Sequence, residues 1–231
     1  MRVGNQGIPL WFRCFEGKNN TDAFDEELLK QGIKYVSDLF DDSFDLIFLA
    51  DRWFNSTTLL QYIEELDYTY VVRLKRNLKV KVNGSLNHKN VKTVGDIKAY
   101  VNKAKHFNNA ILTDNEFKTN IAISKQKGVK EPWIIATNGD PKRAIKDYGY
   151  RFGGIEFVFK NQKSNGFRME STVNASLKYF ESMYTIACFT VLFLTIFGAD
   201  YTKNTKCYKE IKLETHKKIK GIRKKLYHYL I

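Results

Sequence analysis

The sequence contains little cysteine, and the cysteines it has are poorly placed for cross-linking. Cys14, Cys188 and Cys207 are odd in number, far apart and without a CxxC spacing. A disulfide scaffold needs paired cysteines and a structural zinc site needs closely spaced ones, so the pattern argues against both classes of protein. It fits a reducing compartment, and we expect the protein to be cytoplasmic.

Apolar segments of the kind that membranes require are also scarce. The segment from Met1 to Gly7 has no apolar core such as a signal peptide carries. One long apolar run, from Met183 to Ala199, contains hydroxyl-bearing residues and is shorter than the roughly 20 residues of a membrane-spanning helix. We therefore predict a buried helix at this run and no membrane partner.

Positive charge dominates the sequence, and it is unevenly spread. The formal net charge is +13, which favours a polyanionic partner such as nucleic acid over a merely soluble basic protein, because basic surfaces attract phosphates. Residues 21–67 carry 12 acidic and 3 basic side chains, a net of −9, whereas residues 201–231 carry 10 basic and 2 acidic ones, a net of +8. An acidic patch beside a basic remainder suits metal binding next to nucleic acid, although an ordinary acidic surface helix around Asp25–Glu27 explains most of it.

The sequence of the first third of the chain indicates alternating strands and helices. A length of 231 residues with 43% hydrophobic residues suits one packed domain, with or without an insertion. The continuous apolar run at 45–50 is typical of a strand buried on both faces, and Ser56 is placed to cap a helix that runs to Leu66. With a further strand at 68–74, this order indicates a mixed α/β core. Before it we expect a strand at 7–15 and an amphipathic helix at 19–40, capped by Thr21 or Asp22.

From residue 76 onward the pattern changes to short β-branched runs separated by Asn, Gly and Lys. We interpret 76–131 as a β-rich insertion. Its expected elements are strands at 79–82, 110–113 and 119–124 and a short helix at 94–104. After it we expect a core strand at 133–137, a helix that begins at Asp140-Pro141, helices at 155–165 and 172–197, and a Lys-rich amphipathic helix from Tyr201. The predicted organisation is core at 1–75, insertion at 76–131, core again at 132–200, and a basic tail at 201–231.

Asp51 is the first residue placed for chemistry. It directly follows the predicted buried strand, and strand ends in α/β sheets open into the crevice where ligands bind. Two-metal cleavage of phosphodiesters needs carboxylates that converge on the ions from different elements. The plainer interpretation of Asp51 is a turn residue between strand and helix, with no ligand.

Glu156 and Lys163 form a second candidate pair. They are seven residues apart, so on a helix they share one face, two turns from each other. Glu156 can then ligate a metal ion while Lys163 reaches a phosphate. The plainer alternative is a solvated pair of surface charges.

Two segments together resemble a known family. Residues 47–74 (IFLADRWFNSTTLLQYIEELDYTYVVRL) and 148–163 (YGYRFGGIEFVFKNQK) are similar to DDE transposases of bacterial insertion sequences, and above all to the insertion sequence four family with its Tyr–Arg–Glu–Lys signature. In that signature two, three and six residues separate the four members. Tyr148, Arg151, Glu156 and Lys163 match it, except that four residues stand between Arg151 and Glu156. We expect the Gly153-Gly154 pair to absorb the extra residue as a bulge or a late helix start. Trp53 stands where the family's second aspartate motif, Asp-Arg-Gly-Phe, has Gly.

The resemblance implies an α/β fold of the RNase H-like type, which is a mixed sheet flanked by helices, with the β-rich insertion between the second Asp and the Glu. It also implies two Mg²⁺ ions, replaceable by Mn²⁺, held by an Asp–Asp–Glu triad. Asp51 would be the second acid and Glu156 the third, both as catalytic and metal-binding residues. The residues implied in DNA binding are Tyr148, Arg151, Lys163 and Arg52.

The activity that the resemblance implies is DNA strand cleavage followed by strand transfer, in which a freed 3′-hydroxyl attacks target DNA. The partners would be double-stranded DNA, at the transposon ends and at the target, and a second copy of the chain in a homodimer on paired ends. The protein would then be associated with the nucleoid in the cytoplasm.

The first carboxylate of the triad is expected before Gly7, where none of the six residues is acidic, and Asp22 and Asp25 fall on the following predicted helix. We therefore predict a chain without the first strand of the fold, without a complete triad and without an N-terminal DNA-end-binding region. This leaves open whether the chain is an active enzyme. It is either a transposase fragment or a non-catalytic DNA-binding remnant that can inhibit intact transposase. A third alternative is a membrane-surface protein that uses its Lys-rich tail.

Overall fold

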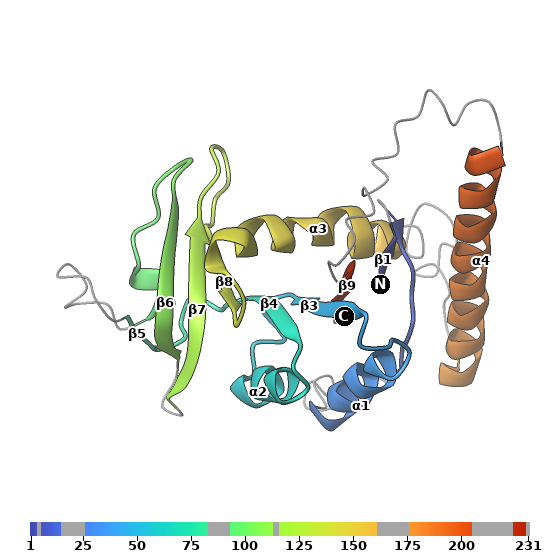
Figure 1. The fold of residues 1–231 in the computed structure, drawn as a ribbon, viewed down its shortest axis with the longest axis horizontal. Coiled ribbons are helices and arrows are strands. Elements are labelled where there is room, and N and C mark those ends of the chain that lie inside the picture. Colours follow the sequence, from blue (N-terminus) through green and yellow to red (C-terminus); the bar gives the residue numbers. More distant parts are fainter. Residues whose placement is uncertain are drawn as a thin grey trace.

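The computed structural model describes seven stretches of the chain, and these form a mixed α/β structure. The described residues are 1–3, 6–14, 26–82, 93–112, 116–160, 176–204 and 224–229. Figure 1 shows helix α3 (Pro141–Lys160) on one face of a sheet and helices α1 (Glu26–Ser37) and α2 (Thr57–Glu65) on the other. Within these residues the sheet has seven strands in the order β5-β6-β7-β8-β4-β3-β9. They are β3 (Phe44–Ala50), β4 (Thr69–Arg73), β5 (Val80–Lys81), β6 (Ala104–Leu112), β7 (Phe117–Ser124), β8 (Trp133–Thr137) and β9 (Lys224–Tyr229).

Strand β3 is buried on both faces, as its apolar run predicts. Its side chains alternate between two cores: Leu46 and Phe48 pack in a cluster with buried residues of α1 and α2, whereas Ile47 and Leu49 pack with buried residues of α3. β3 pairs in parallel with β4, and α2 forms the crossover between them. The Ser56 hydroxyl caps α2 by accepting the Leu59 N–H at 3.4 Å, so the predicted strand–helix–strand unit is confirmed.

The segment interpreted as an insertion continues the same sheet. β5 pairs antiparallel with β6, β6 with β7 and β7 with β8, so these strands extend the sheet beyond β8. The expected helix at 94–104 is wrong. A 3-10 turn covers Val94–Asp96, where the Asp96 carboxylate accepts the Thr93 N–H at 2.8 Å, and the chain then becomes extended and enters β6 at Ala104.

The N-terminal strand is shorter than expected. The paired residues are those of β1 (Arg2–Val3) and β2 (Gln6–Gly7), and Ile8–Cys14 forms no strand pairing.

The backbone at Gly7 crosses α3 at very close range. A Cβ atom on Gly7 would lie 2.6 Å from the Gly154 carbonyl oxygen and 2.7 Å from Val158 Cγ2. Gly7 is therefore required by the approach of one backbone to another.

The boundaries of α1 and α3 differ from the expected ones. α1 ends at Ser37 and not at Phe40, and its expected start and caps lie outside the described residues. Pro141 begins α3 as predicted, with the Asp140 carboxylate accepting the Lys142 N–H at 2.9 Å, but α3 then continues without a break to Lys160. A separate helix starting at 155 is therefore wrong. Residues 161–165 lie outside the described part.

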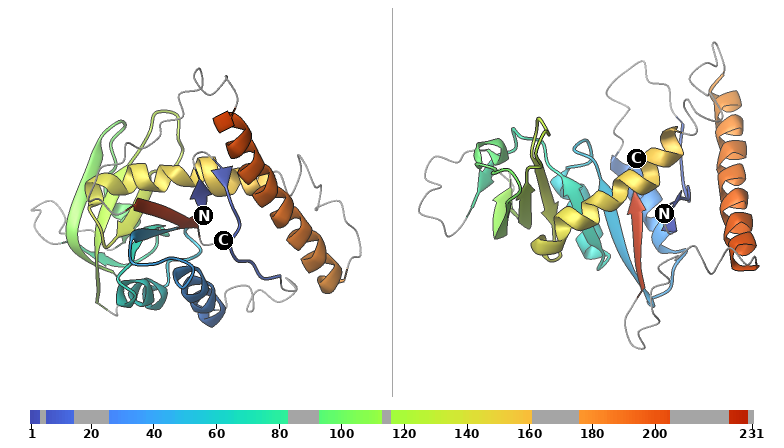
Figure 2. Two further views of the ribbon diagram at one scale, coloured as in Figure 1. Left: turned by 45° about the vertical axis from the view of Figure 1, so that its right-hand side comes forward. Right: turned by 90° about the horizontal axis from the view of Figure 1, so that it is seen from above.

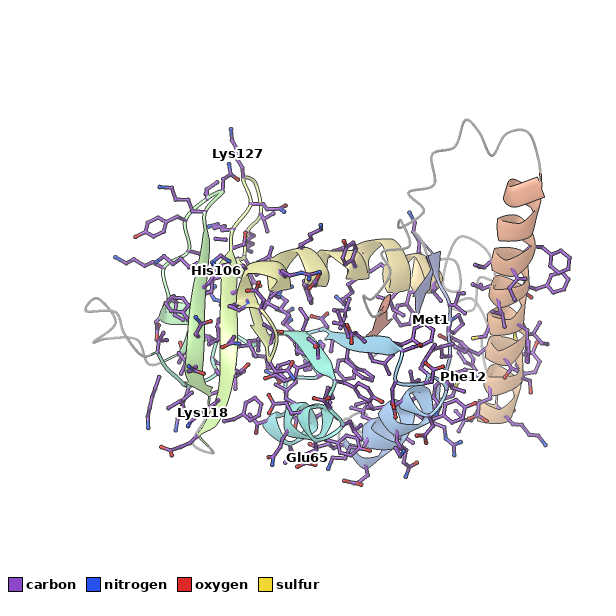
Figure 3. All side chains as sticks on the ribbon, viewed as in Figure 1. Met1, Phe12, Glu65, His106, Lys118 and Lys127 are labelled. Atoms are coloured by element: carbon purple, nitrogen blue, oxygen red, sulfur yellow. The ribbon has the colours of Figure 1, made fainter. Side chains whose placement is uncertain are left out.

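Helix α4 (Leu177–Asn204) is long and apolar, but it is not buried. Figure 2 shows it standing apart from the sheet, and Figure 3 shows the labelled Phe12 beside it. The ring of Phe12 lies 4.6 Å from that of Tyr184, whereas Phe189 and Leu194 are about two-thirds exposed. The expected burial is therefore wrong, because apolar composition alone does not supply a covering partner. By length and composition Leu177–Gly198 could cross a membrane.

The end of the chain also departs from expectation, because Lys224–Tyr229 forms a strand and not a helix. β9 pairs in parallel with β3, from Phe44↔Lys224 to Leu49↔Tyr229. The sequence of β9, KKLYHY, contains two Tyr residues, which favour strands, and the edge of β3 offers unpaired backbone groups. Residues 205–223 of the expected tail helix lie outside the described part.

The close crossing at Gly7 predicts a sharp difference between two glycine substitutions. Gly7→Ala should lower the free energy of unfolding by about 1–3 kcal/mol, because its methyl group must displace the backbone of α3. Gly149→Ala is the matched control. It lies inside α3 with no atom within 4 Å of the added Cβ, so it should raise stability by about 0.5–1 kcal/mol. Urea unfolding measures both. Equal stability of Gly7→Ala and wild type would contradict the described crossing.

Candidate functional site

The candidate site lies at one edge of the sheet, where several strands end together. Asp51 directly follows β3, and Arg73 is the last residue of the parallel neighbour β4. β8 runs antiparallel to β4 and begins at this same edge with Trp133. Ligands of open α/β sheets bind outside the carboxyl ends of parallel strands, so Asp51 has the position that the sequence predicted.

A tight turn fixes the carboxylate of Asp51. The Phe54 N–H donates to the Asp51 carbonyl at 3.0 Å, and the Arg52 N–H donates to Asp51 Oδ1 at 2.6 Å. The second carboxylate oxygen, Oδ2, faces α3 and lies 3.4 Å from Arg151 Nη2. The turn therefore holds one oxygen and leaves the other for a partner across the site.

Arg151 brings the predicted residues together. Besides its ion pair with Asp51, its Nη1 lies 4.0 Å from Glu156 Oε1 and donates to the Tyr148 hydroxyl at 3.4 Å. The side chain of Arg151 is only 16% exposed. A guanidinium is a small, planar group. Asp51 and Glu156 therefore meet at one side chain, each beside a different terminal nitrogen of Arg151.

The extra residue between Arg151 and Glu156 is not absorbed by a bulge. α3 is a continuous α-helix through both residues, so they lie roughly 140° apart around its axis. The long Arg151 side chain spans that angle, which places Glu156 at the half-exposed flank of the helix. The expected bulge or late helix start at Gly153-Gly154 is therefore wrong. Gly154 instead lies where Gly7 crosses α3.

Tyr148 lies beneath Arg151 and is 1% exposed. Its ring packs edge-on against Trp133 at 5.2 Å and against Phe152 at 6.3 Å, while Trp133 and Phe152 stack on each other. Burial raises the pKa of the Tyr148 hydroxyl, so it stays protonated at physiological pH. In this arrangement the ring of Tyr148 offers no surface to DNA. It holds the guanidinium of Arg151 in place.

Two residues that the sequence did not single out, Glu131 and Arg73, also belong to the site. Glu131 pairs with both Arg52 and Arg73, its Oε2 lying 3.5 Å from Arg52 Nη1 and 3.4 Å from Arg73 Nη2. Arg52 was a predicted DNA-binding residue, and its side chain is held by this acid. The position of Arg73 at the end of the strand next to Asp51 was a usable signal. Lys163 lies outside the described residues.

The donor set suits a hard divalent cation. Asp51 and Glu156 offer carboxylate oxygens, and Mg²⁺ is commonly held by one or two carboxylates together with substrate phosphates. Within the described stretches, no group of three or more His, Cys, Asp or Glu residues gathers as a metal site would require. Arg151 Nε is buried and has no acceptor there, a polar group left unsatisfied at the centre of the site.

Comparison with known proteins identifies the family. A family model described as the transposase DDE domain matches residues 3–192, which is most of the chain. The chain therefore belongs to the transposase DDE domain family, and the family implies a DNA substrate and transposase function. No curated protein matches the chain. The family match includes Asp51, Tyr148, Arg151 and Glu156, which the structure brings together.

The position of Arg151 predicts competition between its guanidinium and a metal ion. Arg151→Gln removes a positive charge from between two carboxylates, so Mn²⁺ should bind at least about fivefold more tightly. Isothermal titration calorimetry measures this. Lys142→Gln is the control, because it makes the same change in net charge at an exposed position of α3. An equal gain in both variants, or weaker binding to Arg151→Gln, would contradict the competition.

Proposed function

We propose that this chain acts in DNA strand cleavage and strand transfer at the ends of an insertion sequence, as a member of the insertion sequence four family with an RNase H-like core and an insertion at 76–131. The observation that carries the proposal is the meeting of Asp51 and Glu156 at one guanidinium, at the carboxyl edge of the sheet. These residues come from a strand end and a helix, so their positions are set by rigid elements. The family match supports the same function.

In this proposal Asp51 and Glu156 hold divalent metal, Mg²⁺ or Mn²⁺. Such ions activate the attacking oxygen and stabilise charge on the phosphate when they are bound. Asp51 keeps its orientation because the Arg52 N–H already holds one of its oxygens. Glu156, at the exposed flank of α3, approaches from the other side.

The basic residues hold the DNA backbone in this scheme. When the carboxylates take a cation, the guanidinium of Arg151 is released from its ion pairs and can bind a phosphate in a bidentate way. Arg52 and Arg73 share the single carboxylate of Glu131, so together they keep an excess of positive charge for a second phosphate. Lys163 would add a further phosphate contact. A homodimer would hold two transposon ends side by side.

A second function is favoured by one observation. Asp51 and Glu156 are the two carboxylates that contact Arg151, and within the described residues no group of three His, Cys, Asp or Glu side chains gathers as a metal site would require. A chain with an incomplete triad would bind DNA without cutting it. Such a chain would inhibit intact transposase of the same element by entering mixed assemblies on DNA.

Cleavage is tested with DNA that carries the element's own ends, in Mn²⁺. Asp51→Asn and Glu156→Gln should each lower nicking by at least about 100-fold, because each removes a charged metal ligand. Asp38→Asn is the matched control, since Asp38 is an exposed acid paired with Lys34 away from the site. A gel assay of nicked product measures the effect. Equal loss in the Asp38→Asn variant would argue against the assigned roles.

The same preparations separate the two functions. Salt-dependent binding of duplex DNA without nicking, together with lowered transposition when the chain is co-expressed with intact transposase, would support the inhibitory remnant. Absence of DNA binding by the wild-type chain would exclude both functions.

A further inference from the structure

Helix α4 has two apolar sides, and the described part of the chain covers one of them. On the covered side the ring of Tyr184 lies 4.6 Å from that of Phe12, and Ala187 is 1% exposed. The N-terminal segment that makes this contact packs on α1, because a Cβ atom on Gly32 would lie 2.8 Å from the ring of Trp11. This side of α4 is therefore held against the protein.

The opposite side of α4 presents a regular stripe of exposed residues, which we call the seam. Its members follow one another at alternating spacings of three and four residues: Tyr179, Ser182, Ile186, Phe189, Phe193 and Ile196. They lie about 120–220° around the helix axis from Tyr184, at roughly 100° per residue. Such spacing is the a/d pattern of a heptad repeat, whose residues pack against a second helix. The Ser182 hydroxyl donates to the Lys178 carbonyl at 2.9 Å, so it needs no outside partner.

The apolar area that α4 exposes is larger than a monomer usually leaves in water. The large apolar side chains that are more than half exposed are Tyr179, Ile186, Phe189, Phe193, Leu194, Ile196 and Phe197. A large side chain has about 150–250 Å² to bury, so together these expose roughly 700–1,000 Å². The largest apolar patch of a typical monomer is about 300–600 Å², and each partner of a stable complex buries about 800 Å². The exposed area of α4 thus equals one half of a dimer interface.

The surroundings of the seam favour a second copy of the chain over a lipid membrane. Leu177–Gly198 is long and apolar enough to cross a membrane, but Phe12 already occupies one side of it. A helix that lies on a lipid surface carries Lys or Arg on its polar side, and α4 has neither between Lys178 and Lys203. A two-fold dimer brings the same patch together from both chains, so a second seam supplies the missing helix partner.

We propose that α4 is a dimerisation helix, and that its seam packs against the seam of α4 in a second copy of the chain. The two helices form a short coiled coil, in which Phe189 and Phe193 lie at the centre of the apolar interface. The N-terminal segments lie on the outer sides of this helix pair, so pairing leaves the contact between Phe12 and Tyr184 intact. The inference does not rest on the proposed function, because the pairing requires no DNA.

Sedimentation equilibrium of the full chain without DNA tests the pairing. The wild type should form a dimer. Phe189→Glu and Phe193→Glu should each raise the dissociation constant of the dimer at least about 30-fold, because each charge enters the symmetric interface twice. Phe189→Leu should keep the dimer, since leucine suits this position of a heptad repeat. Both side chains are exposed in the single chain, and thermal unfolding confirms that each variant keeps its fold.

Tyr100→Glu is the matched control. Tyr100 is 52% exposed and precedes β6, which lies at the opposite end of the molecule from α4 in Figure 1, so this variant should leave the dimer unchanged. A monomeric wild type, or a dimer that both glutamate variants leave intact, would overturn the proposal. Flotation of a monomeric wild type with phosphatidylcholine vesicles would assign the seam to a membrane instead. The nicking assay tests the proposed function separately from all of these outcomes.

Discussion

The ion pairs of Arg151 with Asp51 and Glu156 join the end of β3 to the helix that covers it. Like charges repel each other, and the guanidinium that pairs with both carboxylates offsets the repulsion between them. Its position depends in turn on Tyr148 beneath it and on the aromatic packing of Trp133 and Phe152. The core under α3 therefore determines where the charges of the site lie.

This arrangement couples the stability of the protein to its chemistry. In the metal-free state Arg151 neutralises the acids, so the structure does not leave two partly buried negative charges unpaired. The cost is an unsatisfied Nε–H at the same guanidinium. Asp51 and Glu156, which suit a bound cation, are thus held in position by the positive charge of Arg151.

The elements that the sequence predicts correctly are those whose signal is local. β3 and β8 are short apolar runs, and the cap of α2 is a single serine three residues before a backbone donor. The errors fall where a distant partner decides the outcome. The expected burial of α4 fails because nothing in a helix's own composition shows whether another element covers it. Lys224–Tyr229 is a strand because β3 offers it an edge.

The candidate site was predictable to a similar extent. The Tyr–Arg–Glu pattern and the strand before Asp51 identified four residues that lie together. The irregular spacing before Glu156 suggested a distorted helix, whereas the flexible length of Arg151 accommodates the extra residue without one. Glu131 escaped prediction because its role comes from two arginines that are distant from it in sequence, Arg52 and Arg73.

The parallel pairing of β9 with β3 has a consequence for assembly. A strand has two hydrogen-bonding edges, and those of β3 are taken by β4 and β9. Any other segment that inserts beside β3 to reach Asp51 must therefore exchange places with Lys224–Tyr229. An added strand and β9 therefore cannot occupy this edge of β3 at the same time.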